Sequence, residues 1–312
     1  MSERIDVHHH FYAPAYNALL DGRDGIPPYN KRWSSDGSIA EMDRSGIGTA
    51  LLSTSADINM PRQTAHECNE YAATLVRKYP GRFGFFGALP IPDVEGSLLE
   101  IAHALDDLGA QGIGMLTSYD TAYLGDPAFW PIFEELDRRR ALVFVHPRLN
   151  ACCAGMVPDI GPTIIEFGTD TTRAIASLVF SGAAGKFQNI RFIFCHGGGT
   201  MPFLIERFVN LARNPKMSER LPNGLLPELR RFFYDTAQSS NRGAMSSLRE
   251  LVPASQVVFG SDFPYREAID QVAGLANCGF SGDELQSIER GNVAKILQDL
   301  GRDDVLGGKG RL

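Results

Sequence analysis

Short apolar runs of strand length recur along the chain and predict a parallel β-sheet. Several of these runs are apolar at every position, which is typical of strands covered on both faces. Seven runs span residues 47–53, 83–88, 112–116, 142–145, 192–195, 232–234 and 257–259. An eighth predicted strand carries Asp6, close to the N-terminus.

Segments with helical spacing separate the predicted strands. They cover residues 64–78, 170–181, 202–211, 241–251 and 284–300. Asp126 and Pro127 occupy the favoured N-cap and N1 positions of a further helix. Ser38 and Glu41 have the spacing of a capping box, and Gly46 stands where that helix would stop. The chain therefore alternates between strands and helices.

Eight strands alternating with helices predict an α/β fold, a (β/α)₈ TIM barrel of the metal-dependent hydrolase type. A doubly wound open sheet is the alternative arrangement. No G-x-G-x-x-G follows the first strand, so the commonest reason for an open nucleotide-binding sheet is missing. We expect one domain over residues 1–312, with loop insertions near 147–168 and 214–229 as candidate lids or subunit contacts.

The composition excludes several classes of function. The chain has 312 residues, 44% of them hydrophobic, and a net charge of -7, which argues against a nucleic-acid partner. No apolar run approaches the roughly 20 residues that span a bilayer, so we expect a soluble, cytoplasmic protein without a membrane partner. The five cysteines lack a C-x-x-C pair and read as free thiols in a reducing compartment. They are Cys68, Cys152, Cys153, Cys195 and Cys278.

Three of the seven histidines lie in one pentapeptide, Asp6-Val7-His8-His9-His10. Alternate residues of a strand face the same way, so His8 and His10 would present two imidazoles to one point, with Asp6 on that side. The pleat turns His9 to the opposite side. A purification tag is the alternative, but tags usually carry more histidines and a linker.

Three further ionisable residues directly follow predicted strands: His146, His196 and Asp262. Each alone has a structural explanation, as a strand cap, a packed core histidine or a turn residue. The carboxyl ends of barrel strands, however, converge on one pocket. Together with His8 and His10, the three residues therefore predict a metal site.

Imidazole nitrogen with one carboxylate suits Zn²⁺ best, with Mn²⁺, Fe²⁺ or Co²⁺ possible. Five protein ligands would leave little room for chemistry, so His196 is interpreted as an acid/base group beside an open coordination position. His66 and His103 lie within predicted helices and are interpreted as surface or packing residues. The predicted ligands are His8, His10, His146 and Asp262.

The order of these motifs resembles the amidohydrolase superfamily. More narrowly, it is similar to the amidohydrolase-2 branch, typified by aminocarboxymuconate-semialdehyde decarboxylase and 6-methylsalicylate decarboxylase. The resemblance covers nearly the whole chain and implies a (β/α)₈ barrel with one divalent metal, usually zinc, at the four positions above. It also implies that His196 activates or orients water or substrate. The motifs are Asp6-x-His8-x-His10, His146-Pro147, His196-Gly197-Gly198-Gly199 and Ser261-Asp262-Phe263-Pro264.

The resemblance also suggests substrate contacts. The segment from His196 to Arg207 resembles one that supplies an arginine to a substrate carboxylate across a dimer interface. Arg207 is thus a candidate carboxylate clamp in a homodimer, with a solvated helix arginine as the alternative. Two departures argue against the muconate semialdehyde as substrate. The family's second substrate arginine has no counterpart in residues 38–53, and Arg148 follows His146-Pro147 where the family enzyme has tryptophan.

The remaining pocket residues favour an aromatic acid. Arg148, Phe11, Phe263 and Tyr265 would supply one cation and several rings. We therefore expect a metal-dependent, non-oxidative decarboxylase of a small salicylate-like carboxylic acid, with Asp262 or His196 protonating the carbon that bears the carboxylate.

Two alternatives stay open. In a metal-dependent hydrolase or hydratase acting on a lactone, ester or amide, Asp262 would accept a proton from the attacking water and His196 would stabilise the transition state. In a non-catalytic barrel, the metal would only stabilise the fold, and the constellation has one polar group too many for that purpose.

Overall fold

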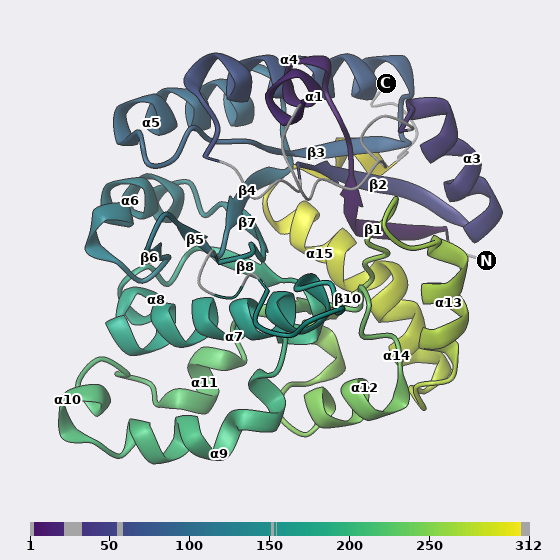
Figure 1. The fold of residues 1–312 in the computed structure, drawn as a ribbon. Helices are drawn as coiled ribbons and strands as arrows, with labels where there is room; N and C mark the ends of the chain where they lie inside the picture. The colour runs from purple at the N-terminus through teal and green to yellow at the C-terminus, as the bar shows by residue number, and fades with distance from the viewer. Residues whose placement is uncertain (1–2, 22–32, 55–58, 151–152, 154, 307–312) are drawn as a thin grey trace.

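Eight parallel strands form the centre of the molecule, in the order β1-β2-β3-β4-β7-β8-β9-β10 (Figure 1). The computed structural model describes residues 3–21, 33–54, 59–150, 153 and 155–306. All eight predicted strands are confirmed. They are β1 (Arg4–His10), β2 (Ile47–Ser53), β3 (Phe83–Gly87), β4 (Gly112–Leu116), β7 (Leu142–His146), β8 (Arg191–Phe194), β9 (Phe233–Asp235) and β10 (Val257–Val258).

The segment after β10 returns to β1 and closes the sheet. The Val7 amide donates to the Phe259 carbonyl at 3.0 Å, and the Asp262 amide donates to the His8 carbonyl at 2.8 Å. The His10 amide donates to the Phe263 carbonyl at 2.7 Å. These bonds close the predicted (β/α)₈ barrel, which the structure confirms, and they place Asp262 beside the end of β1.

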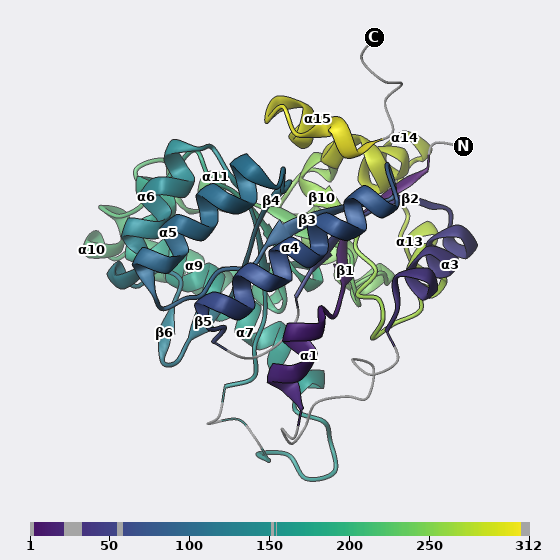
Figure 2. The same cartoon turned by 90° about the horizontal axis from the view of Figure 1, so that it is seen from above.

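Helices surround the strands in both views (Figures 1 and 2). The longer ones are α3 (Ser35–Ser45), α4 (Arg62–Lys78), α5 (Val94–Ala102), α6 (Trp130–Arg138), α7 (Thr163–Ser181), α9 (Met201–Ala212), α12 (Arg242–Arg249), α13 (Ala268–Ala276) and α15 (Asn292–Asp299). The shorter ones are α1 (Pro14–Leu20), α8 (Ala183–Lys186), α10 (Pro215–Ser218), α11 (Leu225–Leu229) and α14 (Gly282–Gln286). A small hairpin, β5 (Ser118–Tyr119) and β6 (Ala122–Tyr123), follows β4.

The buried apolar residues form two clusters. One fills the space between strands and helices. The other includes Ile5, Val7 and Phe144 of the strands together with Val293 and Leu297 of α15. Because these α15 side chains pack with strand residues, the helix covers one end of the barrel and leaves the opposite strand ends for the polar residues.

Several predicted boundaries differ from the structure. The capping box at Ser38 and Glu41 is wrong: α3 begins four residues earlier, and Ser34 caps it by accepting from the Gly37 amide. Gly46 ends this helix in the left-handed conformation, with φ 64°, as predicted. Asp126 also caps as predicted, by accepting from the Ala128 amide.

Three longer segments also differ. The helix predicted over 284–300 is divided by a π turn at Ser287–Gly291. Helix α7 already begins at Thr163, within the stretch expected to be a loop, and α10 and α11 lie within 214–229. In the described residues, none of the helices combines the length and apolar character needed to cross a bilayer.

Candidate metal centre

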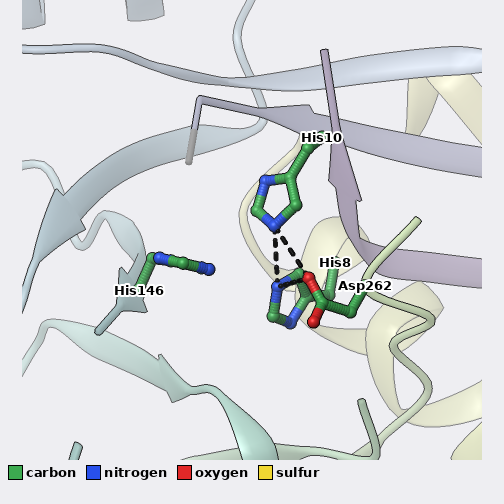
Figure 3. A group of neighbouring side chains, drawn as sticks. All are labelled: His8, His10, His146 and Asp262. Carbon is green, nitrogen blue, oxygen red and sulfur yellow. Dashed lines mark hydrogen bonds and ion pairs between the residues drawn. The ribbon is translucent and has the colours of Figure 1, made fainter. Parts of the chain in front are cut away.

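Four buried side chains meet at the carboxyl ends of the strands. His8 and His10 come from the end of β1, His146 ends β7, and Asp262 follows β10. One donor atom from each lies within 4.8 Å of the others. The Nε2 atoms of His8 and His10 are 3.0 Å apart, and each is 3.1 Å from Asp262 Oδ1. Figure 3 shows His146 facing this group from the opposite wall.

The Nδ1 atoms of the three imidazoles are all engaged away from this centre. His8 Nδ1 bonds to Asp235 Oδ2 at 2.7 Å, and His10 Nδ1 bonds to the Ser53 carbonyl at 3.3 Å. His146 Nδ1 bonds to the carbonyl of Pro147 at 2.8 Å. An oxygen that accepts from Nδ1–H leaves the Nε2 lone pair free, which is how metal-binding histidines are usually oriented.

Burial and neighbouring charges set the ionisation of the cluster. Burial would raise the pKa of Asp262, but the adjacent imidazoles outweigh burial and hold the pKa well below its usual range. Burial lowers the pKa of His10, and burial together with the neighbouring imidazoles lowers the pKa of His146 further. An ionised carboxylate and neutral imidazoles are the forms that bind a metal.

His8 differs from the other two histidines. Burial acts to lower its pKa, but the nearby carboxylates of Asp235 and Asp262 help to raise the pKa well above its ordinary value. A metal therefore competes with a proton at His8 more than at His10 or His146.

His196 lies beside the cluster without joining it. Its Nε2 is buried and makes no hydrogen bond within the part of the chain that the structure describes, and Asp262 Oδ2 is 3.6 Å away. A buried imidazole nitrogen without a partner is costly unless a ligand satisfies it. This orphaned atom and the three-imidazole, one-carboxylate donor set both fit a bound divalent metal with substrate beside it.

The backbone around His196 is unusual. His196 has φ 55° and Asp262 has φ 64°, in the left-handed region that non-glycine residues rarely adopt. Gly199 follows with φ 67°, and a Cβ there would lie 1.9 Å from the Gly168 carbonyl oxygen. The glycine run therefore allows the chain to turn tightly against α7 and present His196 to the cluster.

A model of the amidohydrolase family matches residues 5–298. The chain belongs to this family. Within the amidohydrolase family it is 36% identical over 319 residues to the decarboxylase macB of Penicillium terrestre, a match that covers 94% of each chain. It is 34% identical over 274 residues to the 6-methylsalicylic acid decarboxylase of Penicillium expansum, covering 84% of this chain and 85% of that relative.

A solved structure of the same fold contains a metal. A dihydroxybenzoic acid decarboxylase from a Polaromonas species, with bound manganese and the inhibitor 2-nitroresorcinol, aligns with a TM-score of 0.85 at 22% identity. The alignment covers 99% of this chain and 100% of that one. The family match and the relatives confirm the predicted family, and the likeness to the solved structure supports the barrel. The two named relatives also support the prediction of a decarboxylase for an aromatic acid.

A mostly apolar cavity of about 390 Å³ adjoins the cluster, because His146 lies in its wall. This volume includes space that is open to solvent. The other lining residues are Thr54, Met60, Ala88, Leu89, Gly114, Met115, Leu116, Tyr119 and Phe144.

The predicted substrate contacts lie in different environments. Arg148 is half-buried, with Nη1 3.3 Å from the Ser118 carbonyl. Phe11 is only 1% exposed and lies within the apolar core. Phe263 stacks on His9 at 4.8 Å between ring centroids. Arg207 is exposed on α9, and no contact in the described ranges joins it to the four-residue cluster.

The prediction that Asp6 shares the side of His8 and His10 is wrong. Asp6 Oδ2 lies 3.1 Å from His9 Nδ1 and 2.5 Å from Ser261 Oγ. The strand pairing shifts register between Asp6 and His9, which breaks the simple alternation. Asp6 therefore joins β1 to the segment after β10, while His9 packs away from the cluster as predicted.

Three functional candidates were missed from the sequence. Asp235 is fully buried and accepts from His8 Nδ1 and, at 2.7 Å, from the His196 amide. Asp235 directly follows the apolar run 232–234, so the signal that identified His146 could have found it. Gln238 Nε2 donates to Asp262 Oδ2, and no sequence pattern marks it.

The third is Asp170, which is 1% exposed and connects the loops after β4 and β7. Its carboxylate accepts from the Thr117 hydroxyl, from the Arg148 amide at 3.1 Å and from Asn150 Nδ2 at 2.8 Å. Asp170 is the first residue of the helix predicted over 170–181, so no pattern separated it from an ordinary residue at a helix start.

Proposed function

We propose that the protein is a metal-dependent, non-oxidative decarboxylase of a small aromatic, salicylate-like acid. This proposal rests on His146, which belongs to the four-residue cluster and also lines the apolar cavity. A ring held in the cavity would lie next to the cluster. The 6-methylsalicylic acid decarboxylase among the relatives supports this substrate class.

We assign His8, His10, His146 and Asp262 as the metal ligands. Three imidazoles with one carboxylate favour Zn²⁺, while the manganese in the Polaromonas decarboxylase makes Mn²⁺ the main competitor. A divalent metal in this position supplies Lewis acidity that stabilises negative charge on substrate oxygens. Metal analysis of the purified protein decides between the two ions.

His196 and Asp262 are the proposed catalytic residues. His196 Nε2 gives a proton to the ring carbon that bears the carboxylate. The carbon–carbon bond then breaks, its electron pair returns to the ring to restore aromaticity, and CO₂ leaves. Asp262 Oδ2, at 3.6 Å, stabilises the protonated imidazole before transfer. The low pKa of Asp262 supports this division of roles, because an ionised carboxylate cannot donate the proton.

The proposed substrate-binding residues act at different distances from the ring. Arg148 is proposed to bind a substrate oxygen through its guanidinium. Phe263 borders the cluster through its neighbour Asp262, and Phe11 supports the site from within the core. Arg207 is proposed to contribute from a second copy of the chain.

The Arg207 role requires a homodimer. The homodimer is supported by an exposed apolar side chain on the same helix face. Phe203, four residues before Arg207 on α9, is 88% exposed. Sedimentation of wild type against Phe203→Asp tests the dimer, and a monomeric wild type would remove Arg207 from the site. A cytoplasmic location is also proposed, because the thiols of Cys68, Cys195 and Cys278 are free and buried, as expected in a reducing compartment. Cys152 lies outside the described residues.

Activity assays with metal-loaded protein test the proposed reaction. We expect CO₂ release from 2-hydroxybenzoic acids, including the 6-methyl derivative. In D₂O, the product should carry deuterium at the carbon that lost the carboxylate. Hydrolysis of lactones or esters without CO₂ release from any acid would instead favour the hydrolase.

A further inference from the structure

We propose that His66, Glu70 and His103 form a second metal site, specific for Zn²⁺ or a similar transition metal, between helices α4 and α5. It is separate from the barrel cluster and independent of the proposed reaction. The two helices lie side by side in Figures 1 and 2. His66 and Glu70 are one helical turn apart on α4, and His103 begins the π turn His103–Asp107 that continues α5.

The donor atoms are close to ligating positions. One donor atom from each of the three residues lies within 4.8 Å of the other two, and all three side chains are half-buried. His103 Nε2 is 3.0 Å from Glu70 Oε1, close to the roughly 3.3 Å that separates two tetrahedral zinc ligands with bonds of about 2.0–2.1 Å. Small rotations of accessible side chains would complete the set.

Both imidazoles are already oriented for metal binding. His66 Nδ1 lies 3.3 Å from Glu100 Oε2, and His103 Nδ1 lies 3.1 Å from Asp107 Oδ2. A carboxylate that holds Nδ1 leaves Nε2 available as a ligand. His8 and Asp235 have this same arrangement in the barrel cluster. Glu100 is itself held, because Asn69 Nδ2 donates to its Oε1 at 2.7 Å.

The charges around the pair favour a cation. Within the described ranges, no arginine or lysine forms an ion pair with Glu70, Glu100 or Asp107. Other carboxylates on these helices do have such partners, because Arg62 of α4 pairs with Glu95 of α5 at 3.0 Å. The three carboxylates together carry a charge of about −3, which a divalent ion would offset.

The π turn is a second feature that agrees with a binding site, because such turns occur often at functional positions. Three protein ligands would leave one coordination position open to solvent. The bound ion would connect α4 to α5 in the outer helical layer and would thereby stabilise the contact between them.

Zinc titration of the purified protein, with its barrel metal in place, tests this site. Isothermal titration with ZnCl₂ should reveal one additional ion per chain, with a dissociation constant on the order of micromolar. His66→Ala and Glu70→Gln should each weaken this binding at least tenfold. Glu67→Gln is the matched control. Glu67 is exposed on the same helix, so this substitution removes the same charge outside the cluster.

Thermal unfolding gives a second measurement. Added zinc should raise the melting temperature of wild type and of Glu67→Gln by about 2 °C or more, and should leave His66→Ala unchanged. The content of barrel metal and the circular dichroism spectrum establish that each variant is folded. If His66→Ala does not fold, Glu70→Gln alone tests the site. The proposal is overturned if wild type binds no more zinc than the folded variants, or if Glu67→Gln loses as much as Glu70→Gln.

Discussion

The proposed ligand histidines differ in the partner that accepts from Nδ1. His10 and His146 bond to backbone carbonyls, whereas His8 bonds to the buried carboxylate of Asp235. A carboxylate partner increases the basicity of the imidazole and also its affinity for a proton. Metal binding at His8 is therefore the step most sensitive to pH.

Asp235→Asn should change this sensitivity in a defined direction. In wild type, the metal affinity begins to fall as the pH drops below the raised pKa of His8, which lies above the ordinary value of 6.5. Asparagine removes the negative charge and lowers that pKa, so the release should move to lower pH. At a pH above the raised pKa of His8, where the proton no longer competes, the metal affinity should fall by about 10–100-fold.

Metal content after dialysis across a pH series measures both effects of Asp235→Asn. Asp170→Asn is the control, because Asp170 is also a buried carboxylate but bonds to none of the four ligands. An unchanged pH profile for Asp235→Asn would contradict the assigned role. In the metal-free protein, the His8–Asp235 pair stabilises the fold below about pH 6.5, and this contribution is lost as the pH rises through the raised pKa of His8.

His196→Asn should separate catalysis from metal binding. Asparagine tolerates the left-handed backbone that His196 adopts, so we expect the fold to survive. Loss of the proton donor should reduce kcat by about 10²–10⁴-fold while metal content stays at the wild-type level. If the metal is lost together with activity, His196 is a ligand instead.

Helix α7 and the turn after β8 position this part of the site together. The chain can pass Gly168 only because Gly199 lacks a side chain, and the Thr200 amide donates to the Gly168 carbonyl at 3.3 Å. His196 is three residues before that contact. The turn is consequently fixed by the neighbouring helix as well as by its own sequence.

Gly199→Ala should destabilise the protein and reduce kcat. We expect a loss of about 1–2 kcal/mol from the left-handed backbone and a further ~1–3 kcal/mol from the clash with Gly168. Gly301→Ala is the matched control, because Gly301 has φ 64° and no heavy atom within 4 Å of an added Cβ. Chemical denaturation measures both variants, and equal losses would show that the contact with α7 contributes nothing.

The proposed metal site joins the first strand of the barrel to the segment after the last strand. Asp262 is held beside His8 by the closure between β1 and the segment after β10, 254 positions apart in sequence. Charged and polar groups buried at one point are expensive to maintain without a ligand. Metal binding and barrel closure should therefore be coupled.

Chelation of the barrel metal should lower the melting temperature without unfolding the protein at 25 °C. A metal present at about 1,000 times its dissociation constant stabilises the folded state by ~4 kcal/mol, which corresponds to roughly 5–10 °C here. Differential scanning calorimetry before and after chelation, with metal restored as the control, measures the shift. An unchanged melting temperature would mean that the four residues do not bind the ion.

The eight strands and most helices follow from local patterns, since apolar runs and helical periodicity depend on neighbouring residues alone. The proposed ligand set was also accessible from sequence, because His8 and His10 alternate on the first predicted strand and His146 and Asp262 come just after apolar runs. Motif order added the family and its chemistry. Asp235 has the same signal after residues 232–234 and could have been found.

Other features were decided only by the tertiary structure. The register shift that turns Asp6 toward His9 and Ser261 arises from pairing between strands, which no local pattern specifies. The start of α3 at Ser35 reflects a choice among several possible serine caps. His66 and His103 read as isolated helix residues until α4 and α5 pack side by side. Sequence therefore determined which residues are candidates for the chemistry, whereas long-range packing determined which of these candidates meet.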